Sequence, residues 1–185
     1  MSLFGDGLEA AVQKAFTRPA PKSAPAQMRY LVKQLKSTKA VAQMLRISQR
    51  TVERYVKDQI KKPRPELAAR LEREVKKRWQ PQIRARARKR AATTDGIVID
   101  TQARIGYTAP VGTTDDARVR HLTVALPPQY AARLFDAQQA GATDQQLQQI
   151  TAEALKEVYF QDSGRRAGSL EEVRFTDIEH LEFEL

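Results

Sequence analysis

The sequence contains no cysteine, only two histidines, and no apolar run long enough to cross a membrane. Without cysteine there can be no disulfide framework, no thiolate zinc site and no thiol nucleophile. The amphipathic N-terminus lacks a signal-peptide pattern, so we expect a soluble, intracellular protein. Neither a Walker loop nor a dinucleotide fingerprint occurs. Most catalytic signatures are therefore missing, and the strand-like contexts of His121 and His180 favour structural or surface roles for both imidazoles.

Acidic residues are scarce in the first half of the chain. Residues 1–92 hold 24 Lys and Arg against 7 Asp and Glu, a net charge of +17, whereas residues 93–185 hold 8 against 15, a net charge of −7. Such asymmetry is typical of a polyanion-binding part joined to a part with another role. Nucleic acids and acidic membrane surfaces would both attract the basic half, so a motif is needed to choose between these two partners.

Residues 38–57 have the pattern of a helix-turn-helix. Apolar residues at helical spacing form two faces, and they are Val41, Ala42 and Leu45, then Val52, Tyr55 and Val56. Ser48 can cap the second helix, because its oxygen can accept a free amide of the first turn. Arg46 occupies the turn where glycine is usual, which leaves open whether the backbone there forms a standard tight turn.

The second helix leaves a polar face that could lie in a DNA major groove, where Arg can grip guanine bidentately and Gln can grip adenine. The residues expected to contact DNA from this region are Gln49, Arg50, Thr51, Arg54, Lys57, Lys61 and Lys62. An ordinary helical hairpin with a solvated charged face is the alternative. Half a dozen positions agree with one another, and this agreement favours DNA binding.

Residues 81–95 contain a basic arm with almost no apolar content. Beside a helix-turn-helix, such an arm is expected to lie along phosphates, and its affinity for DNA would then fall steeply with salt. The expected contacts are Arg84, Arg86, Arg88, Lys89 and Arg90. The alternative is a solvated basic segment without a ligand.

The pattern changes after residue 95. Apolar runs and alternation predict strands at 97–99, 105–107 and 122–126, and closing strands at 173–175 and 181–185. Two helical patterns intervene, and a capping box of Thr143 and Gln146 opens the second. The sequence thus predicts an α+β protein with three parts. These are an all-α DNA-binding domain over 1–80 that contains the helix-turn-helix (38–57), a basic connector over 81–95, and a small α+β domain over 96–185.

The whole chain resembles the telomere terminal proteins of Streptomyces-type linear chromosomes and plasmids. The segments that carry the resemblance include 1–8 (MSLFGDGL), 48–56 (SQRTVERYV), 111–116 (VGTTDD) and 175–181 (FTDIEHL). The resemblance implies a protein joined covalently to the 5′ ends of linear DNA, which primes the synthesis that fills the recessed 5′ gap. It also implies recruitment by a telomere-associated protein to folded 3′ single-stranded ends. In that family the link is to a threonine of the loop that matches 111–116, and the match falls on Thr114.

A polymerase needs a hydroxyl to extend, and an exposed protein hydroxyl near DNA can supply one. The residues alone do not rank Thr113, Thr114 and Tyr107, and only the resemblance selects Thr114. Asp115 and Asp116 could orient the hydroxyl or assist a metal, although a solvated turn is the alternative. We expect no tightly bound cofactor. Mg²⁺ and dNTP would take part in the priming reaction through the partner polymerase.

The expected function is therefore a protein primer in end-patching replication and not an enzyme. The expected partners are telomeric DNA, a telomere-associated protein and a DNA polymerase, with no membrane, in the cytoplasm and at the nucleoid. The alternative from another class is a helix-turn-helix transcriptional regulator whose C-terminal half senses a ligand or dimerises. A third interpretation is an enzyme that nucleotidylates itself.

Overall fold

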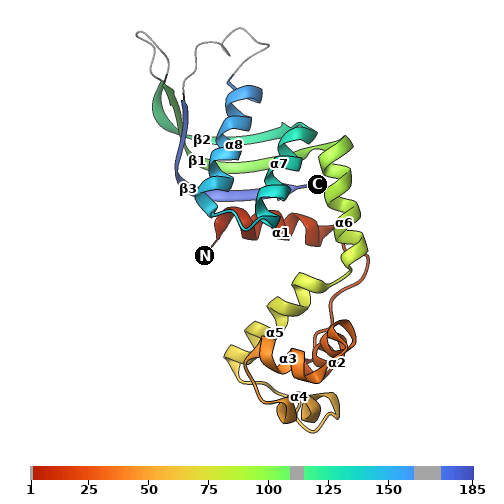
Figure 1. The fold of residues 1–185 in the computed structure, drawn as a ribbon. Helices are drawn as coiled ribbons and strands as arrows, with labels where there is room; N and C mark the ends of the chain where they lie inside the picture. The colour runs from red at the N-terminus through yellow and green to blue at the C-terminus, as the bar shows by residue number, and fades with distance from the viewer. Residues whose placement is uncertain (1, 109–114, 161–171) are drawn as a thin grey trace. The chain divides into compact units, whose positions relative to one another are not determined.

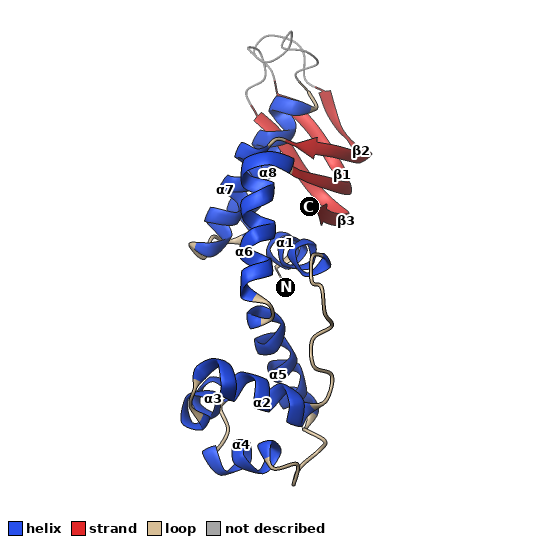
Figure 2. Cartoon of the chain, turned by 90° about the vertical axis from the view of Figure 1, so that its right-hand side faces the viewer, coloured by secondary structure: helices blue, strands red, loops and turns tan. Residues whose placement is uncertain are grey.

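The computed structural model describes residues 2–108, 115–160 and 172–185. Within these ranges the chain forms eight α-helices, one short π-helical segment and a three-stranded antiparallel sheet, which confirms the predicted α+β class (Figures 1 and 2). The chain divides into two compact units, residues 17–81 and residues 1–16 together with 82–185. No helix in the described ranges has the length and apolar character needed to cross a membrane.

The unit of residues 17–81 is entirely helical. Its helices are α2 (Ala24–Leu35), α3 (Thr38–Leu45), α4 (Gln49–Val56) and α5 (Pro65–Arg78). The core consists of apolar side chains from all four helices, namely Ala24, Met28, Leu31, Val41, Ala42, Leu45, Val52, Tyr55, Leu67, Leu71 and Val75. Pro65 begins α5, where its missing N–H leaves no helical acceptor unpaired. The apolar spacing that predicted helices at these positions thus also provides their packing surface.

The second unit is built on a sheet of β1 (Ile97–Thr108), β2 (Asp115–Leu126) and β3 (Glu172–Glu184) in the order β2-β1-β3. Ile99 of the central strand pairs with Val124 on one side and with Phe183 on the other. The helices α1 (Leu3–Lys14), α7 (Pro128–Gln139) and α8 (Asp144–Val158) cover one face of the sheet (Figure 2). Side chains from that face and the three helices form a second core.

The predicted strands 97–99 and 105–107 are parts of one continuous strand, β1. The predicted strands 173–175 and 181–185 are likewise parts of β3. In β1, Thr101 and Ala103 fill the buried positions between the two apolar runs, so the alternation seemed to stop there. The Thr101 hydroxyl donates to the His180 carbonyl at 2.8 Å, which satisfies this buried polar group. The register of β3 against β1 shifts between Gln102 and Arg104 of β1. This irregularity interrupts the apolar alternation along β3.

The N-terminal helix belongs to the sheet unit, whereas the sequence analysis placed it in a helical domain over residues 1–80. The carboxylate of Asp144, in the first turn of α8, accepts the backbone N–H groups of Leu3, Phe4 and Gly5 at 2.6, 3.0 and 3.1 Å. Phe4 is buried and its ring lies 6.0 Å from that of Phe175 in β3. These partners are about 140 or more positions apart in the sequence, and local patterns give no signal for them.

Residues 81–95, predicted as a basic connector, are helical, and residues 82–95 belong to the sheet unit. Helix α6 (Pro81–Arg90) runs into the π-helical segment η1 (Ala91–Asp95), and Gly96 ends it with a φ of +75°. A Cβ at Gly96 would lie 2.2 Å from the Leu126 carbonyl oxygen, so only glycine fits the turn into β1. Ala91 is buried and η1 contacts α7, which makes this segment part of the sheet unit.

Candidate nucleic-acid interface

Helix α4 is fixed at both ends by side chains. At its start, the Ser48 hydroxyl oxygen accepts the N–H of Thr51 at 3.1 Å, as the sequence predicted for a capping serine. At its end, Arg29 of α2 donates to the Val56 carbonyl at 3.2 Å and to the Asp58 carboxylate at 2.7 Å. Val52 and Tyr55 are buried beneath the helix. The outward face is therefore presented by a helix whose position is well defined.

The turn before α4 is a tight turn despite its arginine. Arg46 adopts the left-handed conformation with φ +55° and ψ +49°, where glycine is usual. The N–H of Ile47 returns to the Ala42 carbonyl at 3.0 Å, and the N–H of Arg46 to the Gln43 carbonyl at 3.2 Å. A non-glycine residue in this region costs about 1–2 kcal/mol. The turn is thus under strain that the core of the unit offsets.

The outward face of α4 carries the polar residues that the sequence analysis selected. Gln49, Arg50, Arg54 and Lys57 are exposed, and so are Lys61 and Lys62 beyond the helix. Thr51 differs from the others, because its hydroxyl is hydrogen-bonded to that of Ser48 at 2.8 Å. Thr51 therefore serves the cap of the helix. Arg50, Arg54 and Lys57 form the cationic face of α4, with Gln49 at its start.

Two residues that the sequence analysis did not select restrain Gln49. The Gln49 amide nitrogen donates to the Thr38 hydroxyl of α3 at 3.0 Å and to the Glu53 carboxylate at 3.1 Å. Spacing of four residues within a helix could have suggested Glu53. Thr38 lies eleven positions away in the sequence, and only the crossing of α3 and α4 brings it to Gln49.

The unit that contains α4 is strongly cationic. Residues 17–81 hold 18 Lys and Arg against 5 Asp and Glu, a net charge of +13. Three of those five acids, Asp58, Glu72 and Glu74, lie in ion pairs with neighbouring cations. The sheet unit, counted over its whole sequence, holds 14 against 17, a net charge of −3. The positive charge is therefore concentrated in the unit that presents α4.

The five basic residues of α6 fall into two groups. Arg84 is buried and donates two hydrogen bonds to the Glu9 carboxylate of α1, at 2.6 and 2.5 Å. Arg88 is partly buried, with a nitrogen 3.7 Å from the same carboxylate, and its guanidinium lies over the Phe135 ring. Arg84 thus does not fit the expected phosphate contact, because its charge is used inside the unit. Arg86, Lys89 and Arg90 are exposed, although Arg90 also pairs with Asp95 at 2.5 Å.

The Glu9 carboxyl shows the electrostatic effect of this cluster. Burial raises the pKa of Glu9, but hydrogen bonds from Arg84 and Gln13 and the charges of Arg84 and Arg88 outweigh it, so the pKa is lowered overall. Burial likewise lowers the pKa of Arg88, with the neighbouring charge of Arg84 acting in the same direction. The ionised pair is therefore the stable state of Glu9 and Arg84.

Thr113 and Thr114 lie outside the described residues, as do the other members of 109–114 and the side chains of Asp115 and Asp116. In the sequence, Thr114 immediately precedes the first residue of β2, and Asp115 pairs with Tyr107 of β1. The Tyr107 ring packs edge-on against Phe160 with centroids 5.4 Å apart. Over the described residues, no group of three or more His, Asp or Glu could hold a metal ion.

Both histidines are exposed on the sheet. His121 and His180 each place Nε2 3.2 Å from the Asp100 carboxylate. The pKa of Asp100 is lowered, first by the Thr123 hydroxyl that donates to it at 2.6 Å and then by His121. The group resembles a surface polar network more than a catalytic site, since both imidazoles are open to solvent.

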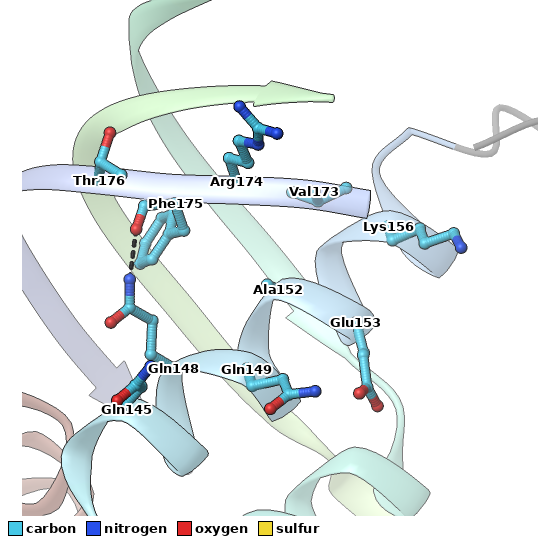
Figure 3. A pocket seen from close by; sticks show the side chains of 10 residues that line it. All are labelled: Gln145, Gln148, Gln149, Ala152, Glu153, Lys156, Val173, Arg174, Phe175 and Thr176. Atoms are coloured by element: carbon cyan, nitrogen blue, oxygen red, sulfur yellow. Dashed lines mark hydrogen bonds between the residues drawn. The ribbon is translucent and has the colours of Figure 1, made fainter. Parts of the chain in front are cut away.

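A pocket of about 720 Å³ lies between α8 and the edge strand β3 (Figure 3). Its walls are the glutamine-rich face of α8 and the first part of β3, and Gln148 donates to the Phe175 carbonyl across it. The lining combines amide groups with an aromatic ring, which suits a small polar ligand.

Comparisons of the chain with models of protein families, with curated proteins and with solved structures found no match.

Proposed function

We propose that this chain binds DNA through the cationic face of α4, with α3 and α4 acting as a helix-turn-helix. The observation that carries the proposal is the helix itself, which is capped by Ser48, held by Arg29 and cationic at Arg50, Arg54 and Lys57. A helix with a buried apolar side and a fixed polar side can enter a major groove and place its first residues at base edges. The three-residue turn between the two helices suits this arrangement.

The charge distribution supports the same proposal. A net charge of +13 over residues 17–81 attracts phosphates without regard to sequence. Of the α6 residues, Arg86 and Lys89 are exposed and could add phosphate contacts, whereas Arg84 is held by Glu9. We therefore keep the exposed cations of α6 as proposed phosphate contacts and no longer include Arg84 among them.

We further propose that the chain is a terminal protein that primes DNA synthesis from Thr114. Support comes from the resemblance in sequence and from the place of Thr114, one residue before a strand whose start is paired with β1. In the reaction, the Thr114 hydroxyl oxygen attacks the α-phosphate of a deoxynucleotide, a phosphodiester forms, and pyrophosphate leaves. The hydroxyl proton passes to a base, and the polymerase positions Mg²⁺. Asp115 and Asp116 are proposed to orient the hydroxyl.

The test of the priming proposal uses the full chain in an extract that contains its partner protein and polymerase. Transfer of an α-labelled deoxynucleotide is measured, and the labelled peptide is mapped by mass. Thr114→Val keeps the shape and removes the oxygen, so it should accept no label, whereas Thr113→Val should keep at least part of the activity. Full labelling of Thr114→Val, or a label at Thr113 or Tyr107, would disprove the assignment.

A transcriptional regulator is the second candidate, and the pocket between α8 and β3 favours it. A regulator would bind duplex DNA reversibly, and a small ligand in that pocket would change its affinity. DNA from cells that make the protein separates the two candidates. Terminal fragments that enter a gel only after protease treatment indicate a covalent terminal protein, and fragments that enter without protease indicate a regulator.

A further inference from the structure

The hydrogen bonds around Gln49 define which groups of that side chain can reach a base. A glutamine amide has two N–H donors on its nitrogen and acceptor capacity on its oxygen. Here the nitrogen donates to the Thr38 hydroxyl at 3.0 Å and to the Glu53 carboxylate at 3.1 Å. Both donors are therefore used within the protein, and the oxygen is the group of this amide that remains for a partner.

The orientation of the amide follows from the chemistry of its neighbours. An ionised carboxylate can only accept hydrogen bonds, so the nitrogen of Gln49 and not its oxygen must face Glu53. Thr38 then accepts the second N–H. The second oxygen of Glu53 adds acceptor capacity on the same helix, four residues after Gln49. The Gln49 oxygen is thus an acceptor at the start of α4, followed along the helix by the exposed donors Arg50 and Arg54.

We propose that the Gln49 amide oxygen acts as an acceptor that selects a base with an exocyclic amino group in the major groove, either cytosine or adenine. This inference rests on the proposed DNA-binding function. Cytosine N4 and adenine N6 are the amino donors of the major groove, whereas guanine O6 and thymine O4 are acceptors that would face acceptors. The bidentate grip of glutamine on adenine, expected from the sequence, needs a free N–H for adenine N7, and Gln49 has none to offer.

The test is selection of bound sequences from a randomised duplex library with the full-length protein, followed by sequencing. A good bidentate contact discriminates by about 1–3 kcal/mol and tenfold corresponds to about 1.4 kcal/mol. A single hydrogen bond to a base belongs at the lower end of that energy range. Among the selected sequences, cytosine and adenine should therefore be about fivefold more frequent than guanine and thymine at one position. Gln49→Met should remove that preference and leave the preferences at neighbouring positions in place.

Thr38→Val gives an independent readout, because it should change the preference and not abolish it. Without the Thr38 acceptor, one N–H of Gln49 becomes free for adenine N7, so adenine should gain over cytosine by about fivefold. Ser37 and not Thr38 caps α3, so the helix keeps its cap in this variant. Gln43→Met, at an exposed glutamine of α3, is the matched control and should leave every position unchanged.

The outcomes separate the inference from the function on which it rests. Duplex binding with no change of base preference in Gln49→Met and Thr38→Val would overturn the inference alone. The same holds for a wild-type preference for guanine or thymine that Gln49→Met removes. If the wild-type protein binds no duplex even at low salt, the proposed DNA-binding function fails, and the inference fails with it. Circular dichroism of each variant should match wild type, which excludes unfolding as a cause.

Discussion

Removing the Arg84 side chain should destabilise the sheet unit, although the sequence places Arg84 within a DNA-binding arm. The side chain is 7% exposed and holds the Glu9 carboxylate, which is 27% exposed, with two hydrogen bonds. Breaking a fully buried ion pair costs about 3–5 kcal/mol. Because Glu9 keeps some solvent and has Arg88 at 3.7 Å, we expect Arg84→Met to cost about 2–3 kcal/mol, which is a fall of roughly 5–10 °C in Tm.

Arg86→Met is the matched control, because Arg86 lies on the same helix and is exposed. Its stability should change by no more than about 0.5 kcal/mol, while the salt dependence of DNA binding should weaken by about one phosphate contact. Arg84→Met should leave that salt dependence unchanged. Thermal unfolding followed by circular dichroism, and DNA titrations at several salt concentrations, measure the two effects. A stable Arg84→Met protein with a reduced salt dependence would refute the reasoning and restore Arg84 to the interface.

Other perturbations test separate parts of the structure. The pKa of Glu9 is lowered in the folded state, so its stabilisation is full above the ordinary carboxyl pKa of about 4.3 and is lost as the pH falls through the folded value. Glu9→Gln should therefore make the free energy of unfolding depend less on pH in that range. Asp144→Ala leaves the first amides of α1 without their acceptor and should cost about 1–2 kcal/mol in chemical denaturation. Arg46→Gly relieves the left-handed backbone and should stabilise the protein by about 0.5–1 kcal/mol, read as a higher Tm. Arg50→Ala should relax sequence preference in library selection, whereas a uniform loss over all sequences would make Arg50 a phosphate contact.

Local sequence determined the helices that contain the candidate interface. The spacing of Val41, Leu45, Val52 and Tyr55 predicted two amphipathic helices, and Ser48 predicted where the second begins. These features depend on residues three or four positions apart, which a helix places on one face. The capping box of Thr143 and Gln146 is of the same kind and is present at the start of α8.

Strand lengths were harder to predict, because an edge or central strand tolerates polar residues wherever one side of the sheet faces solvent. The small and polar residues of β1 interrupted the apolar pattern, although the backbone pairing continues through them. Pairing depends on the neighbouring strand, and the neighbour of the first half of β1 includes residues near the C-terminus of the chain. No window of adjacent residues contains that information.

Only the tertiary structure decided which charges remain available for a ligand. From the sequence, Arg84 and Arg86 are equally suited to contact phosphates, because they lie two residues apart in one basic run. The fold places Glu9 of α1 against Arg84 and leaves Arg86 exposed. Likewise, the crossing of α3 over α4 places Thr38 against Gln49 and uses the amide donors that adenine would need. The physical reason is the same in both cases, because a hydrogen-bonding group is satisfied by whichever partner the fold brings within about 3 Å, however distant that partner is along the chain.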